Sequence, residues 1–167
     1  MTLKLYVAGP LFTPYHRAQH ARTAAFLRRK GYICFVPHEF SVTRAFDNDT
    51  GTPATPIGIF DDDYDMINES DAIVALLDDP DVSSGLACEL GIFWMMMQSN
   101  PSKKGILGLL TDDRAYRRHD VKMPPINAFT LGCVLDSGNI YNNINDILEH
   151  LNCWNSGESR PKGEIKR

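Results

Sequence analysis

The sequence predicts an α/β protein with one doubly wound domain, in which a five-stranded parallel sheet of Rossmann or flavodoxin-like type carries helices on both faces. Three apolar, β-rich runs support this prediction: residues 3–9, 72–77 and 105–110. Helical spacing follows these runs, and strands that alternate with helices form parallel sheets covered on both faces. A chain of 167 residues has the size of a single domain.

In the first third of the chain, LKLYVAG (3–9) predicts a strand that stops at a Gly-Pro pair. Residues 14–30 predict an amphipathic helix, because basic residues gather toward its carboxyl end and Gly31 follows it. A short strand is predicted at 33–37. Residues 38–57 combine Asp, Asn, Thr, Gly and Pro, and we interpret them as a long loop, a feature that is usually functional or mobile in compact domains.

The rest of the chain repeats the alternation. A helix at 57–71 precedes the clearest strand, AIVALL (72–77), whose continuous apolar run suits a strand buried on both faces. The remaining elements, in chain order, are a helix at 84–98, a strand at 105–110, a polar loop at 111–125, a short helix from about Ile126, a weak strand at 139–141 and a closing helix at 142–151. The domain is therefore expected to span residues 1–151. A polar tail, 152–167, is expected to be disordered in part.

Composition and charge exclude several classes of protein. The net charge of −4 offers no basic surface for a nucleic-acid polymer. No apolar run reaches the roughly 18 residues that span a bilayer, and the N-terminus resembles a strand rather than a signal peptide. The four cysteines form no CxxC pair, which predicts reduced thiols in a cytoplasmic protein without zinc. His16 and His20 lie one helical turn apart with no acidic or cysteine ligand, and we expect them on a solvated helix face.

The candidate site lies where the strands end, because ligands of open α/β sheets bind beyond the carboxyl ends of the strands. The chain has no GxGxxG, GxxxxGK[ST] or GxSxG motif, so dinucleotide binding, P-loop chemistry and a hydrolase serine are unsupported. This edge instead offers carboxylates, from the run Asp61–Asp63 and from Glu89. Two carboxylates that face a pocket can cleave a glycosidic bond, one beside the anomeric carbon and one moving the proton of the leaving group.

Glu89 stands in DVSSGLACELG, one turn inside a predicted helix and among small apolar neighbours. The helix dipole favours its anionic form, and the small neighbours let a sugar ring approach, as a nucleophile requires. The alternatives are structural. Glu89 would then be an exposed helical glutamate, Asp63 part of a solvated acidic first turn, and Tyr6 a buried core tyrosine.

Four segments, KLYVAGPLF, GIFDDDYDMINESDAIVALL, SSGLACELG and PPINAF, occur in the order and approximate spacing of the nucleoside 2-deoxyribosyltransferases. The chain resembles this family from residue 3 to about 151. The resemblance implies transfer of 2-deoxyribose between nucleobases by a retaining double displacement through a covalent glycosyl-glutamate. It implies no metal or organic cofactor. The expected partners are nucleosides, nucleobases and further copies of the chain, and neither a nucleic-acid polymer nor a membrane.

The family's motifs place roles on individual residues. The nucleophile falls on Glu89, the aspartate that protonates the base on Asp63, and the tyrosine that helps to hold the nucleophile on Tyr6. The resemblance also places His38 near the base, where many relatives carry a glutamine, and assigns Asn127 to the sugar in a neighbouring subunit's site. The other expected substrate contacts lie on the same edge: Gly9, Pro10, Phe12, Ser83 and Gly85.

One departure from the family leaves the substrate open. Many transferases have an aspartate at the position of Ser83, whereas the related deoxynucleoside 5′-monophosphate N-glycosidases have a serine near the phosphate. That branch also tends to carry serine at the position of Asn127. Ser83 therefore resembles the N-glycosidases, whereas Asn127 resembles the transferases. Three functions therefore stay open: a transferase, a hydrolase of deoxynucleoside 5′-monophosphates, and a nucleotide-sensing module without turnover. Residues 94–98, WMMMQ, are expected at a subunit interface.

Overall fold

The computed structural model describes residues 2–39, 55–79, 81–112 and 126–166. Six parallel strands form one sheet in the order β2-β1-β3-β4-β5-β6. Their bounds are β1 Lys4–Ala8, β2 Ile33–Phe35, β3 Ala72–Leu76, β4 Gly105–Leu109, β5 Asn139–Tyr141 and β6 Ile165–Lys166. The predicted parallel α/β fold is confirmed, with six strands in place of five.

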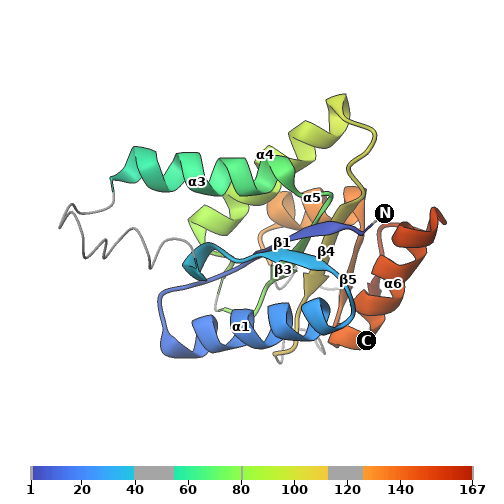
Figure 1. The fold of residues 1–167 in the computed structure, drawn as a ribbon, viewed down its shortest axis with the longest axis horizontal. Helices are drawn as coiled ribbons and strands as arrows, with labels where there is room; N and C mark the ends of the chain where they lie inside the picture. Colours follow the sequence, from blue (N-terminus) through green and yellow to red (C-terminus); the bar gives the residue numbers. More distant parts are fainter. Residues whose placement is uncertain (1, 40–54, 80, 113–125, 167) are drawn as a thin grey trace.

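Helices cover both faces of the sheet. α1 and α6 lie on one face, and α3, α4 and α5 lie on the other (Figure 1). The helices are α1 Pro14–Arg29, α3 Pro56–Glu69, α4 Ser84–Ser99, α5 Ala128–Ser137 and α6 Ile144–Ser156. Most of the two predicted loops, residues 40–54 and 113–125, falls outside the described residues, as does Pro80.

Each of these helices begins at a side chain that accepts a hydrogen bond from the backbone of the first turn, which satisfies an otherwise unpaired N–H group. Proline follows the cap at the start of α1 and α3, where its missing N–H costs nothing. The capping residues are Thr13, Thr55, Ser83, Asn127 and Asn143. The local sequence thus fixes where α3 and α4 start, and with them the candidate site.

The alternation along β1 separates two cores. Leu5 and Val7 pack with α1 and α6, whereas Tyr6 and Ala8 point to the opposite face, toward α3 and α4. Successive side chains of a strand point to opposite faces, so Tyr6 is directed at the two helices that carry the candidate carboxylates.

A buried lysine fixes the end of α3. The ammonium group of Lys103 donates to the carbonyl oxygens of Ile67, Asn68 and Ser70, at 3.3, 3.1 and 2.7 Å. It also lies 4.9 Å from the ring centroid of Phe93 in α4. Cations stabilise helix carboxyl ends, where carbonyls lack partners. Lys103 therefore ties α3 to the sheet and to α4.

The C-terminal segment contributes a helical turn and a short strand beyond residue 151. α6 continues past residue 151 to Ser156, and it buries Trp154 against the core. β6 then joins β5, where the side chain of Asn139 accepts from the backbone N–H of Glu164 and donates to the carbonyl of Pro161, both at 2.8 Å. A two-residue strand leaves no periodic signal, which is why only five strands were predicted.

The prediction that His16 and His20 lie on a solvated face of α1 is wrong for His20. His20 is fully buried, and His16 is half-buried, because this side of α1 packs against the ends of β1 and β3. Among the described residues, no helix is both long and apolar enough to cross a membrane.

Candidate active site

The candidate site begins with a hydrogen bond between β1 and α4. The hydroxyl of Tyr6 donates to Oε1 of Glu89 over 3.0 Å. Tyr6 is fully buried, and its pKa is raised far above the ordinary value by burial and by the charges of Glu89 and Asp63. The phenol therefore stays protonated and acts only as a hydrogen-bond donor to the carboxylate.

Two helices form the walls of a cavity of about 190 Å³ beside Glu89. Both helices contribute residues at the spacing i, i+3, i+4 and i+7, which places four side chains on one helix face. These are Phe60, Asp63, Tyr64 and Ile67 from α3, and Gly85, Cys88, Glu89 and Ile92 from α4. Asp63 and Glu89, the two carboxyl residues predicted to be catalytic, therefore line the same cavity.

Burial sets the protonation of both carboxyl groups. Burial raises the pKa of Glu89 to about 8, with a further increase from Asp63 and a partial decrease from the Tyr6 hydrogen bond. Burial and the neighbouring Asp62 raise the pKa of Asp63 to about 6. The helix dipole was expected to favour ionised Glu89, but desolvation outweighs it because a charge loses more free energy on leaving water than the dipole returns.

The second carboxylate oxygen of Glu89 has no partner among the described residues. Oε2 is buried and accepts no hydrogen bond, while Oε1 is held by Tyr6. A buried oxygen without a partner is costly unless a ligand or another group satisfies it. The geometry thus leaves Oε2 as the atom that is available to a ligand.

Two aromatic side chains flank Asp63, and neither was among the predicted site residues. The rings of Phe60 and Tyr64 stack with centroids 5.8 Å apart and an angle of 29° between planes. Both rings are partly exposed. An exposed aromatic pair beside a carboxyl group can stack against a planar ring. The signal in the sequence was the i, i+4 spacing of the two aromatics around Asp63.

The other predicted contacts lie around this cavity or apart from it. Gly85 lines it, whereas the hydroxyl of Ser83 caps α4 by accepting from the N–H of Leu86 at 3.3 Å. Phe12 follows β1 and is 88% exposed. Asn127 is exposed and caps α5, accepting from the N–H of Phe129 at 3.0 Å.

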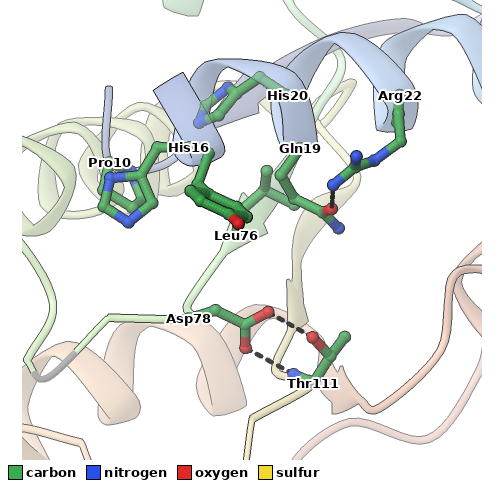
Figure 2. A pocket seen from close by; sticks show the side chains of 9 residues that line it. Pro10, His16, Gln19, His20, Arg22, Leu76, Asp78 and Thr111 are labelled. Carbon is green, nitrogen blue, oxygen red and sulfur yellow. Dashed lines mark hydrogen bonds between the residues drawn. The ribbon is translucent and has the colours of Figure 1, made fainter. Parts of the chain in front are cut away.

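Three predicted residues lie near α1. Gly9 and Pro10 follow β1, and His38 follows β2, where its ring packs against His20. Pro10 borders a second hollow, of about 220 Å³, between α1 and the ends of β3 and β4 (Figure 2). Within that hollow, the carboxylate of Asp78 accepts from the backbone N–H of Thr111 at 2.6 Å. None of the three predicted catalytic residues lines it.

No arrangement of three or more His, Cys, Asp or Glu in the described part of the chain is suited to hold a metal ion. The four cysteines are unpaired, and Cys88 is exposed at the cavity. The described cavity presents two carboxyl groups, one of them held by a phenol, together with the thiol of Cys88.

The fold and the cavity together define a class: a parallel α/β protein with a two-carboxyl site between two helices on one face of its sheet. The chain belongs to the nucleoside 2-deoxyribosyltransferase family, whose model matches residues 5–145. An uncharacterized protein from Ureaplasma parvum serovar 3 is 26% identical over 153 residues, which cover 89% of this chain and 94% of that protein. Family membership supports a function of the nucleoside deoxyribosyltransferase type.

Solved structures share the fold. A conserved protein from Enterococcus faecalis V583 is similar at a TM-score of 0.72 and 25% identity, over 91% of this chain and 98% of that one. A 2-deoxyribosyltransferase from Leishmania mexicana has a TM-score of 0.62 at 18% identity, over 90% and 97% of the two chains. A 2-deoxyribosyltransferase from Bacillus psychrosaccharolyticus has a TM-score of 0.56 at 21% identity, over 86% and 89%.

Proposed function

We propose that this protein transfers 2-deoxyribose from one nucleobase to another through a covalent intermediate on Glu89. The observation that carries the proposal is the placement of Tyr6, Glu89 and Asp63. A buried phenol holds one oxygen of Glu89, the other oxygen is unpartnered, and Asp63 lines the same cavity. A site for a two-step glycosyl transfer needs a nucleophile and a separate proton donor.

In the first step, Oε2 of ionised Glu89 attacks the anomeric carbon C1′, and the bond between C1′ and the base nitrogen breaks. The electron pair of that bond leaves with the base, which takes a proton from the carboxyl group of Asp63. The product is a deoxyribosyl ester of Glu89 and a free base. The hydroxyl of Tyr6 keeps Oε1 in place, so the attacking oxygen has a fixed direction.

In the second step, a nitrogen of the incoming base attacks C1′ from the side that the first base left. The ester bond breaks, Glu89 recovers its negative charge, and Asp63 takes up the proton of the incoming base. Two inversions give net retention at C1′. The raised pKa of Asp63, about 6, favours this use because the group can both give and receive a proton near neutral pH.

The stacked rings of Phe60 and Tyr64 supply a surface for the base next to this proton donor. An aromatic surface can stack against purines and pyrimidines alike, since both bases are planar. His38 follows β2 on the same edge of the sheet, and in this proposal it lies beside the base.

A hydrolase is the second candidate, in which water attacks the ester of Glu89. Ser83 favours the version that acts on a 5′-monophosphate, because it opens α4 and helix N-termini attract phosphate. Against it, the described lining of the cavity includes Asp63 and Glu89 and no lysine or arginine. Two carboxyl groups without a nearby cation disfavour a phosphate, so we propose a nucleoside as the substrate.

We further propose that the site is completed in a homo-oligomer. An apolar groove of about 610 Å³ runs over α3, α4 and α5. Within it, Met95 and Phe129 are 60% and 85% exposed, and Asn127 lies two residues before Phe129. Exposed apolar patches of this kind mark association surfaces. A second copy seated on this groove would bring its Asn127 near the neighbouring site.

The transfer proposal is tested by incubating the protein with deoxyinosine and free adenine and measuring deoxyadenosine and hypoxanthine by chromatography. We expect both products in equal amounts. Release of hypoxanthine without deoxyadenosine would support the hydrolase instead. Binding of the nucleoside with neither product would support a module without turnover. Glu89→Gln serves as the matched control, because it preserves size and removes the nucleophile.

A further inference from the structure

A buried histidine connects three segments at the edge of the sheet. His20 of α1 is fully buried, and Figure 2 shows it projecting from the helix beside His16. A Cβ added to Gly9 would lie 2.9 Å from Nε2 of His20 and 2.9 Å from Cβ of Leu76. Gly9 also has a φ of +152°, which favours glycine. The imidazole therefore fills the space beneath the turn that follows β1.

The third segment is the one that follows β2. The rings of His20 and His38 pack edge to face, with centroids 5.8 Å apart and planes at 88°. Nδ1 of His38 is buried without a partner in the described structure. Among the described residues, the edge-to-face contact with His20 is thus an observed constraint on the orientation of this ring, whereas its Nδ1 makes no hydrogen bond.

The residue after His38 is held by the same helix. Arg28 of α1 binds both oxygens of Glu39, at 2.9 and 2.6 Å, and also donates to the carbonyl of Cys34 at 2.8 Å. A two-point arginine–carboxylate pair fixes geometry as well as charge. α1 thus contacts the segment at two points: Arg28 binds the side-chain carboxylate of Glu39, and His20 packs against the ring of His38.

We propose that His20 is a positioning residue, which orients the imidazole of His38 toward the nucleobase and so sets the preference among bases. The proposal rests on the proposed function, in which His38 lies beside the base. Burial lowers the pKa of His20 to about 4, so the ring is neutral near pH 7 and does not repel its neighbour. A neutral ring packed edge to face fixes orientation through contact rather than through charge.

The test compares His20→Leu with His20→Gln, His38→Ala and the double variant His20→Leu/His38→Ala. The readout is kcat and KM for transfer from deoxyinosine to adenine and to cytosine. We expect His20→Leu to change the adenine-to-cytosine ratio of kcat/KM by about tenfold, mainly through KM, since a displaced contact weakens binding of the base. His20→Gln, which keeps a polar planar side chain, is expected to recover most of the ratio.

The double variant separates positioning from packing. If His20 acts through His38, His20→Leu changes the ratio less than about twofold when His38 is already alanine. Thr23→Val, a buried substitution on the same helix, is the matched control and is expected to leave the ratio unchanged. An equal effect of His20→Leu in both backgrounds would overturn the proposal, as would an unchanged ratio in His20→Leu.

A readout without turnover keeps the two proposals apart. The ring signals of His38 are recorded by NMR in the wild type and in His20→Leu, with and without free adenine. We expect the His38 signals to move in His20→Leu, and adenine to shift them less than in the wild type. If the wild type has no transferase or hydrolase activity, the proposed function fails, and these spectra still decide the role of His20. Identical His38 spectra in both proteins would overturn it.

Discussion

Tyr6 and Glu89 stand 83 residues apart in the chain and are joined by one hydrogen bond of 3.0 Å between β1 and α4. The bond uses one carboxylate oxygen and leaves the other buried and unpartnered. It also lowers the pKa of Glu89, although burial raises that pKa by more. The phenol thus has two effects on the proposed nucleophile: it fixes its direction, and it makes ionisation easier.

Tyr6→Phe is expected to slow transfer about 10- to 100-fold at pH 7, which corresponds to the roughly 1.5–3 kcal/mol of a hydrogen bond to a charged group. The variant should fold, because the ring that fills the core is kept. Initial rates together with a thermal unfolding curve check this result. A folded Tyr6→Phe protein with unchanged rate would show that the hydrogen bond has no part in the reaction.

Asp63→Asn is expected to slow transfer by about 10²–10⁴-fold, the usual contribution of a general acid. Asp61→Asn and Asp62→Asn are the matched controls, because they remove the same charge from neighbouring positions that do not line the cavity. Their rates should fall far less. Similar losses in all three variants would mean that the acidic run acts only through its summed charge.

The same variant has a signature in the pH profile. Transfer requires ionised Glu89 and protonated Asp63, so kcat/KM is expected to rise through about pH 6 and to fall through about pH 8. These values belong to the pair of coupled groups. In Asp63→Asn the alkaline fall should disappear, because no acid remains to lose its proton. The acidic rise should remain, since Glu89 must still ionise, but it should move from about pH 6 toward the pKa of Glu89 itself, about 8. An alkaline limb that survives in Asp63→Asn would assign the acid to another group.

The nucleoside is expected to be a better substrate than its 5′-monophosphate. The described cavity presents Asp63 and Glu89 and no cation, so a phosphate meets repulsion worth about tenfold or more in kcat/KM. Deoxyinosine and its monophosphate are compared at one salt concentration. An advantage for the monophosphate that is lost in Ser83→Ala would move the chain to the N-glycosidase branch.

Acid stability is expected to depend on His150. The ring is buried, and Nδ1 lies 2.8 Å from the hydroxyl of Tyr141, which accepts from the side-chain amide of Asn139 at 3.3 Å. The hydroxyl can then donate to a neutral ring only. Burial, with Arg160 and Lys166, lowers the pKa of His150 from 6.5 to about 4.

The lowered pKa of His150 sets the direction in which stability changes with pH. The unfolded chain binds a proton near pH 6.5 and the folded protein does not, so stability is complete above pH 6.5 and decreases as the pH falls toward 4. Urea unfolding at pH 7.5, 6 and 5 measures this decrease. His150→Gln should be less stable at pH 7.5 and should show a shallower decrease. In this variant the free energy of unfolding should still decrease somewhat at low pH, because the pKa of His20 is also lowered to about 4. An unchanged slope in His150→Gln would contradict this assignment.

Much of the fold could be predicted because its signals are local. The apolar run of β3 and the caps at Thr13 and Ser83 are encoded in adjacent residues, and they give elements close to those predicted. The sixth strand could not be predicted, because β6 has two residues and depends on Asn139, far away in sequence.

The candidate site divides in the same way. Glu89 and Asp63 were predicted from motifs, and the structure brings both to one cavity with Gly85. The burial of His20 was missed because an i, i+4 histidine pair looks the same on a solvated and on a buried helix face. Only the packing of α1 against Gly9 and Leu76 distinguishes the two cases. The raised pKa of Glu89 was missed for a related reason, since desolvation depends on neighbours that the sequence does not place.

The covalent role of Glu89 is the central claim, and mass spectrometry of a trapped intermediate tests it most directly. The protein is mixed with a 2′-deoxynucleoside, quenched in acid within the turnover time and digested. We predict one deoxyribosyl group on the peptide that contains Glu89, and none when Glu89→Gln is treated in the same way. An adduct on a different peptide, or near-normal turnover in a folded Glu89→Ala protein, would contradict the account.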